Sequence, residues 1–307
     1  MDNNPLKVLI TGGTGFVGGY LLDKLNEDST RCIVTTRNAA RARKKLGNRI
    51  VDAVEWQDAN RPPELSSHED IDAVVNLMGD NVAARWTAKK KQAIRESRIV
   101  GTRRLVDAIL ARPRKPRVFV SASAVGYYPD EGDRVITEES PPCDRFLSDI
   151  CRDWELETER LQGHDIRIVI LRIGIVLGKG GGAIGSLLPL FKWCLGGPLG
   201  SGRHYMPWIH VKDVAGLIHW AIHNEPAQGV YNATAPNPVT NREFTKAFAR
   251  AVGRPAFLPA PRFGVRLVAG EFANELFMSQ RVVPEAALSD GFQFEFTGID
   301  AALKDII

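Results

Sequence analysis

The sequence lacks the features that mark a disulfide-rich domain, a metal centre or a membrane protein. Its 307 residues contain four cysteines without a CxxC pair and six histidines without an HExxH motif, so we expect neither disulfides nor a bound metal. No apolar run approaches the roughly 20 residues that span a bilayer. No signal-peptide-like apolar stretch precedes the first predicted strand, and we therefore expect a cytoplasmic protein without a membrane segment.

Acidic residues are scarce between residues 85 and 117, where only Glu96 and Asp107 stand among many lysines and arginines. Such a basic stretch could bind nucleic acid or another anionic partner. The alternative is the solvated face of a long helix that turns Ile94, Leu105 and Ile109 inward. Because no nucleic-acid-binding motif accompanies the charge, we expect no nucleic-acid binding, while a protein partner remains open.

Short apolar runs alternate with helical patterns through most of the chain, which predicts an α/β fold with a doubly wound parallel sheet of the NAD(P)-binding Rossmann type. Beyond Arg172 the sequence becomes rich in glycine and proline, which favours a small C-terminal substrate lobe. We predict a nucleotide-binding domain at 1–173 with a return segment at 211–235, and a smaller lobe at 174–210 and 236–307. The predicted strands are 6–10, 32–36, 73–77, 118–121 and 166–171, and the predicted helices are 15–26, 85–110 and 146–161.

The segment KVLITGGTGFVGGYLLDKL places three glycines directly after an apolar strand and at the start of a helix. In this context, Gly12 permits a tight turn, Gly15 lets the backbone approach a pyrophosphate, and Gly18 lets the helix lie against the sheet. The helix N-terminus then offers N–H groups and a positive dipole end to the phosphates. The motif therefore predicts a dinucleotide site.

The residues after the second predicted strand indicate which dinucleotide binds. NAD sites place an acidic residue about 20 positions after the glycines, where it accepts hydrogen bonds from the ribose 2′-hydroxyl. This chain has Thr36, Arg37 and Asn38 at that point. A guanidinium suits a 2′-phosphate, so we predict NADP(H), the alternative being that Arg37 is only a surface residue.

Five motifs together resemble the extended short-chain dehydrogenases/reductases, the group of nucleotide-sugar epimerases. More closely, the chain resembles the atypical subgroup of epimerase-family, division-inhibitor-like proteins, with which it shares long segments up to the ending RVVPEAALSDGFQFEFTGIDAAL. The resemblance covers nearly the whole chain and implies an NADP(H)-binding fold with a small substrate lobe. The five motifs are TGGTGFVG at 11–18, NLMG at 76–79, SASAVGYY at 121–128, LRIGIVLG at 171–178 and WIHVKDVA at 208–215.

The resemblance also implies roles for individual residues. Arg37 would hold the 2′-phosphate, Asp58 the adenine edge, and Ser123 a reacting carbonyl. Leu77 and Gly79 would lie on the adenosine side of the cofactor. The full set of cofactor-binding residues that we expect is Gly12, Thr14, Gly15, Phe16, Val17, Gly18, Arg37, Asp58, Leu77, Gly79 and Ser121.

The chain departs from the family at the residues that move protons. The family's catalytic helix carries a Tyr and a Lys one turn apart, whereas this chain offers Phe146 with Ile150, or Leu147 with Cys151 if the register shifts by one. Arg98 also stands where many epimerases have Asn. Tyr20 and Lys24 have the right spacing, but they lie on the first helix near the pyrophosphate end of the cofactor.

Three other side chains are therefore candidates for the proton chemistry, namely Ser123, Tyr127 and Tyr128. Both tyrosines could instead pack beneath the substrate loop, and Cys151 is expected to be an inert buried thiol. We predict an NADP(H)-dependent oxidoreductase or epimerase-like enzyme of a small-molecule substrate. The alternatives are an NADPH-binding regulator with weak turnover and a division-related partner protein.

Overall fold

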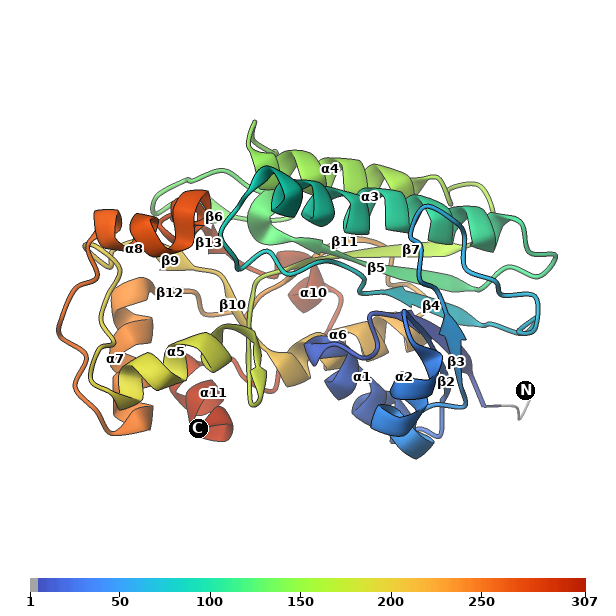
Figure 1. Ribbon diagram of the computed structural model, residues 1–307, viewed down its shortest axis with the longest axis horizontal. Helices are drawn as coiled ribbons and strands as arrows, with labels where there is room; N and C mark the ends of the chain where they lie inside the picture. The colour runs from blue at the N-terminus through green and yellow to red at the C-terminus, as the bar shows by residue number, and fades with distance from the viewer. Residues whose placement is uncertain (1–4) are drawn as a thin grey trace.

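A seven-stranded parallel sheet forms the centre of the molecule in the computed structural model, which describes residues 5–307 (Figure 1). The chain runs outward from the first strand to one edge, returns to the other side of that strand, and continues to the opposite edge. The strand order therefore reverses between β1 and β4, where dinucleotides bind in such folds. In spatial order the strands are β11 (Gly229–Ala233), β7 (Arg167–Ile173), β5 (Val118–Ala124), β4 (Ala73–Asn76), β1 (Lys7–Thr11), β2 (Arg31–Thr36) and β3 (Asp52–Glu55).

Helices cover both faces of this sheet. The first face carries α1 (Phe16–Asn26), α2 (Ala39–Leu46) and α6 (Val211–His223), and the second carries α3 (Ala88–Leu110) and α4 (Phe146–Glu159) (Figure 1). Because successive strand residues point to opposite faces, Val8 and Ile10 pack with α1 and α6, while Leu9 packs with Leu105 and Ile109 of α3. The predicted doubly wound α/β fold is confirmed.

The remaining elements gather mainly beyond the sheet, around a second apolar cluster that includes Leu177, Trp208, Phe248 and Leu303. The division of the chain into two lobes at the predicted boundaries stays a prediction. The larger elements are β8 (Ile175–Gly178), α5 (Gly182–Lys192), β10 (Trp208–His210), α7 (Asn241–Val252), α8 (Arg262–Ala269) and α11 (Ile299–Ile306). The shorter ones are η1 (Gly47–Arg49), η2 (Val125–Tyr127), β6 (Val135–Ile136), β9 (Tyr205–Met206), β12 (Val239–Thr240), η3 (Gly270–Phe272), α9 (Ala273–Leu276), β13 (Arg281–Val282) and α10 (Glu285–Ser289).

The basic stretch at 85–117 lies mostly on α3, and several of its charges meet acidic partners. Arg95 pairs with Asp153 and Arg103 with Glu157, both on α4. Arg112 is buried and donates to backbone carbonyls. The acidic partners come from α4, so part of the positive charge that looks unbalanced in the sequence of α3 is paired in the structure. Among the described residues, no helix combines the length and apolar character needed to cross a membrane.

A buried carboxylate ties the C-terminal segment to α6. Asp213, in the first turn of α6, accepts hydrogen bonds from the backbone N–H groups of Glu295 at 2.7 Å and Phe296 at 3.1 Å. Burial raises the pKa of Asp213 to about 6. Both N–H groups would lose their acceptor if this side chain were removed.

We expect Asp213→Ala to lower the free energy of unfolding by about 1–3 kcal/mol, because a buried donor left without an acceptor carries a cost of that size. Urea denaturation of both proteins measures the loss. Asp300→Ala is the control, since Asp300 forms an exposed pair with Arg250 and such pairs contribute less than about 1 kcal/mol. Equal losses in the two variants would contradict the prediction.

Candidate functional site

The turn between β1 and α1 has the geometry that its three glycines predict. Gly12 has a φ of +70°, and a Cβ there would lie 2.7 Å from the Leu77 carbonyl oxygen. A Cβ on Gly18 would lie 2.5 Å from the Gly12 carbonyl oxygen, so this helix position accepts no side chain without a shift of the backbone. Gly15 is exposed and donates its N–H to the Gly12 oxygen at 2.9 Å. The loop is thereby held close to α1.

The N-terminus of α1 is open to an anion at the carboxyl end of β1. Gly15 is the N-cap residue and has no side chain to occupy the first N–H groups of the helix, which begins at Phe16. The Thr14 carbonyl oxygen accepts a hydrogen bond from Lys45 at 2.7 Å, and Val17 packs against the main core. The loop therefore combines a fixed backbone with a free helix end.

Arg37 lies exposed just beyond β2, and within residues 5–307 its guanidinium takes part in no ion pair. Glu55, which pairs with Thr36 at the end of β3, accepts the backbone N–H of Ala39 at 3.0 Å at the start of the next helix. Arg37 is thus left as the available charge at this strand end.

Asp58 follows β3, where its carboxylate accepts two hydrogen bonds from Asn60, one from the backbone N–H and one from the side chain. The backbone hydrogen bond lowers the pKa of Asp58. One of its oxygens is therefore occupied by this turn, and its expected role at the adenine edge stays a prediction.

A buried polar network holds the adjoining end of β4. Thr11 donates to the Asn76 side chain at 2.7 Å, and Asn76 donates to Thr102 of α3 at 2.8 Å. Thr11 also accepts the backbone N–H of Leu77 at 3.1 Å. The predicted residue Leu77 thus sits beside the glycine loop, with its backbone tied to β1.

The predicted residue Gly79 faces an arginine. A Cβ on Gly79 would lie 2.9 Å from the guanidinium carbon of Arg98, so a larger residue here would displace the end of that side chain. Arg98 donates to the Asp80 carbonyl oxygen at 2.9 Å, and its guanidinium carbon lies 5.3 Å from the centroid of the Trp154 ring. Burial lowers the pKa of Arg98. Arg98 thus lies between the end of β4 and α4.

Helix α4 presents one row of side chains to β5 and to the turn that follows it. Leu147 lies beside Gly126, and the Cys151 sulfur lies 3.6 Å from the Ala124 carbonyl oxygen. We call Leu147, Cys151, Glu155 and Thr158 the β5-facing row. Ile150 is buried with Trp86 and Ile94, and Phe146 packs edge-on against Trp86. This packing favours the register in which Leu147 and Cys151 stand at the positions of the family's Tyr and Lys, and that correspondence stays a prediction.

These two side chains cannot do the work of a Tyr and a Lys. Leu147 carries no proton, and burial raises the pKa of the Cys151 thiol to about 12. Cys151 is buried, as predicted, and a raised pKa makes a thiol a poor nucleophile. The β5-facing row has its carboxylate one helical turn after Cys151, at Glu155.

Ser123 and Glu155 meet at the carboxyl end of β5. The Ser123 hydroxyl donates to Glu155 Oε1 at 2.5 Å, and Arg172 of β7 holds both oxygens of the same carboxylate at 3.0 and 2.8 Å. All three residues are buried. Although burial opposes the charge, the hydrogen bonds from Arg172 to Glu155 raise the pKa of this guanidinium. The result is a buried ion pair that contacts the candidate serine.

The two candidate tyrosines differ in their surroundings. Tyr128 is fully buried, where its hydroxyl donates to Asn232 at 2.7 Å and accepts from Arg172 at 2.9 Å. Burial raises the pKa of Tyr128 to about 12. Tyr127 is only partly buried, and its ring lies under the Arg172 guanidinium at 3.4 Å. These surroundings fit the alternative in which Tyr128 is a packed, structural hydrogen-bond partner, and its role as a candidate for the proton chemistry stays a prediction.

Ser121 is also turned into the structure. Its hydroxyl accepts a hydrogen bond from Thr158 of the β5-facing row at 3.2 Å, and the residue is 1% exposed. Its expected role in cofactor binding stays a prediction. The sequence analysis missed Glu155, Arg172 and Asn232. The helical spacing 147, 151, 155 is the signal that could have found Glu155 once the register was known.

Two segments far apart in the sequence meet at the first turn of α1. A Cβ on Gly181 would lie 2.5 Å from the Phe16 ring, and the Tyr20 hydroxyl donates to the Lys179 carbonyl oxygen at 3.1 Å. Lys24 pairs with Glu27 instead of Tyr20, so the Tyr20–Lys24 spacing does not form a catalytic pair. Helix α5 begins at Gly182, so this glycine-rich segment packs beside the turn between β1 and α1.

Comparisons with known proteins agree with this geometry. Residues 8–234 match the NAD dependent epimerase/dehydratase family, and residues 260–306 match a domain of unknown function, DUF1731. An Arabidopsis thaliana epimerase family protein, the chloroplastic SDR39U1 homolog, is 37% identical over 99% of this chain and 87% of its own length. The Bacillus subtilis epimerase family protein YfhF is 36% identical over 98% of both chains.

A solved structure extends the likeness to three dimensions. The human epimerase family protein SDR39U1, crystallised with NADPH, superposes with a TM-score of 0.88 at 36% identity, covering 98% of this chain and 99% of that one. A UDP-glucose 4-epimerase from Thermus thermophilus, at 20% identity and a TM-score of 0.76, shares the fold. The resemblance predicted from the sequence motifs is confirmed, and the chain belongs to the NAD dependent epimerase/dehydratase family.

Proposed function

We propose that this protein binds NADP(H) and acts as an oxidoreductase or epimerase-like enzyme on a small-molecule alcohol or carbonyl compound. The glycine turn and open N-terminus of α1 fit a pyrophosphate, and Arg37 suits a 2′-phosphate. The human relative with NADPH supports the same cofactor. The single observation that carries the enzymatic part is the contact of Ser123 with the buried Glu155–Arg172 pair.

The direction of the Ser123 hydrogen bond suggests what this site does with a proton. The Ser123 hydroxyl donates to Glu155 Oε1, and Arg172 donates to both oxygens of the same carboxylate. The Ser123 oxygen then has lone pairs left for a substrate hydroxyl. NADP⁺, when bound, supplies the hydride acceptor. Ser123 and Glu155 would accept the proton that leaves an alcohol as it is oxidised.

The apolar residues of the β5-facing row set a limit on the rate. A tuned acid or base contributes roughly 10²–10⁴-fold to such reactions, and Leu147 with Cys151 supplies none. The fold still positions cofactor and substrate, which is a separate contribution. We therefore propose firm NADPH binding together with slow turnover of ordinary sugar nucleotides.

A second candidate function is an NADPH-binding regulator or partner protein with little turnover. The burial of Ser123 and Tyr128 favours it, because both hydroxyls are already engaged by protein groups. Turnover separates the two candidates. An enzyme oxidises or reduces some member of a panel of alcohols and carbonyl compounds, whereas a regulator binds NADPH without consuming it.

Replacing Arg37 tests the cofactor. We expect Arg37→Asp to weaken NADPH binding roughly ten- to a hundredfold, because a charge-assisted contact contributes about 1.5–3 kcal/mol, and to leave NADH binding nearly unchanged. Fluorescence titration measures both affinities. Arg254→Asp, an exposed site far along the chain, is the control for a simple change of net charge. Equal affinities of the unaltered protein for NADPH and NADH would contradict the NADP(H) assignment.

Replacing Gly15 tests the position of the pyrophosphate. Gly15→Val should abolish dinucleotide binding while the protein stays folded, since Gly15 is exposed and its backbone conformation suits any residue. Gly19→Val is the matched control, because a Cβ there meets nothing within 4 Å. Calorimetric titration with NADPH and circular dichroism provide the two readouts. Normal binding by Gly15→Val would show that the dinucleotide lies elsewhere.

Replacing the hydroxyls tests the chemistry. Ser123→Ala should lower kcat for any active alcohol at least tenfold with little change in NADPH affinity, while Ser66→Ala, at an exposed site, should change neither. Tyr128→Phe should mainly lower the melting temperature, because it removes buried hydrogen bonds to Arg172 and Asn232. Unchanged kcat in Ser123→Ala would exclude this serine from the proton path.

A further inference from the structure

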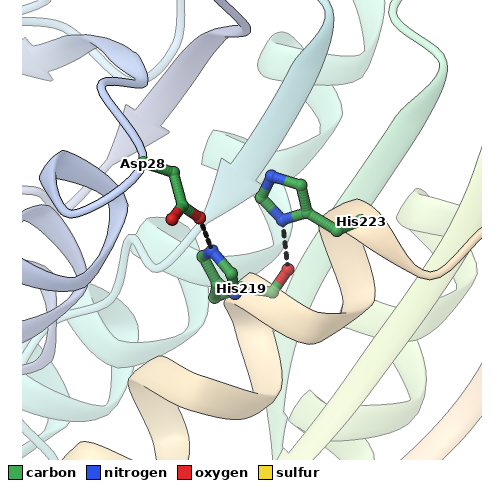
Figure 2. A group of neighbouring side chains, drawn as sticks. All are labelled: Asp28, His219 and His223. Carbon is green, nitrogen blue, oxygen red and sulfur yellow. Dashed lines mark hydrogen bonds and ion pairs between the residues drawn. The ribbon is translucent and has the colours of Figure 1, made fainter.

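Two histidines and an aspartate meet where helices α1 and α6 end, away from the dinucleotide site. His219 and His223 lie on the last two turns of α6, and Asp28 lies in the turn between α1 and β2 (Figure 2). Each of the three residues offers one ligand atom, and these atoms lie within 4.8 Å of one another. Asp28 and His223 are exposed, so an ion could reach them from solvent.

The hydrogen bonding of His223 prepares its ring as a ligand. His223 Nδ1 contacts the backbone carbonyl oxygen of His219 at 2.8 Å (Figure 2). A carbonyl oxygen can only accept, so Nδ1 carries the proton and Nε2 keeps a free lone pair. Metal-binding histidines characteristically donate their other ring N–H to a carbonyl or carboxylate, which fixes the tautomer and the orientation of the ring.

The other two residues supply complementary donors. His219 Nε2 contacts the Asp28 carboxylate, and the rings of His219 and His223 lie beside each other with centroids 4.3 Å apart. Lys24, the nearby cation, pairs with Glu27 at 2.6 Å and so leaves Asp28 to the histidine. A contact between Asp28 and His219 alone would explain the positions of these two side chains. It would not explain why the His223 ring lies next to the His219 ring.

The helix ends also favour a cation here. α1 ends at Asn26, two residues before Asp28, and α6 ends at His223. The C-terminus of a helix carries a partial negative charge, so two such ends next to three donor groups attract positive charge. Both helices are long enough, at 11 and 13 residues, for this effect to be developed.

We propose that Asp28, His219 and His223 form a binding site for a first-row divalent metal ion of the Zn²⁺ type. Two imidazoles and a carboxylate are ligands that suit zinc, and they leave one tetrahedral position for water. Metal–ligand bonds of about 2.1 Å place ligands roughly 3.4 Å apart, so small side-chain rotations would close the site. The bound ion fastens the end of α6 to the turn after α1.

This site revises the expectation that the chain holds no metal. The spacing of His219 and His223 is visible in the sequence, but Asp28 stands 191 residues before His219 and joins them only through the packing of α6 on α1. The site lies at the far end of α1 from the phosphate-binding turn, about 16 Å away for a helix of 11 residues. Metal binding should therefore leave NADPH affinity unchanged.

The test is calorimetric titration of the untagged, chelator-treated full chain with ZnCl₂ and, separately, NiCl₂. We expect one equivalent to bind and the melting temperature to rise. Co²⁺ should give the visible absorption of a tetrahedral nitrogen and oxygen site. Stoichiometric binding that disappears in a His219→Ala, His223→Ala double variant supports the proposal.

Two further variants keep the outcome clear if the double variant is unstable. Asp28→Asn preserves a hydrogen-bond acceptor for His219 but removes the carboxylate, and it should weaken Zn²⁺ at least tenfold. His164→Ala removes an exposed histidine elsewhere and should leave Zn²⁺ affinity unchanged. The absence of stoichiometric binding, or equal affinity in Asp28→Asn and the unaltered protein, overturns the proposal.

Discussion

The buried ion pair between Glu155 and Arg172 organises the carboxyl end of the sheet. Removing two charges from water is costly, and the pair persists because each of its polar atoms finds a partner. Glu155 accepts from Ser123 on β5, while Arg172 on β7 donates to the Tyr128 hydroxyl. Tyr128 in turn reaches Asn232 on β11. Three neighbouring strands and α4 are thus held in one arrangement by a single pair of opposite charges.

The same pair puts a carboxylate on the β5-facing row one turn beyond Cys151. From Cys151 to Glu155 the displacement along the helix is about 6 Å. Arg172 already donates to both oxygens of this carboxylate, so Glu155 is held toward the interior of the sheet. Leu147 and Cys151, which precede it on the same row, leave the neighbouring stretch of α4 without a charged side chain facing β5.

The sequence was a good guide to the sheet and to the glycine turn, because both depend on local patterns: apolar strands, helical periodicity and glycines at fixed spacing. It was a poor guide where long-range contacts decide. The register of α4 depended on which face of the helix meets β5, and two adjacent registers looked equally apolar. The hydrogen-bond partner of Tyr128 could not be foreseen, since Asn232 lies 104 residues further along the chain. The acidic residues of α4 that pair with arginines of α3 could not be predicted for the same reason, because they lie more than 50 residues further along the chain.

The contact between Phe16 and the glycines before α5 has an evolutionary consequence. The aromatic ring occupies the space that side chains at Gly178 and Gly181 would need. A larger residue at Gly181 needs a smaller residue at position 16, whereas at Gly178 the Val211 side chain stands in the way as well. Residue size at position 16 and at the glycines before α5 should consequently covary among relatives. A relative with a larger residue on one side of the contact should have a smaller one on the other side.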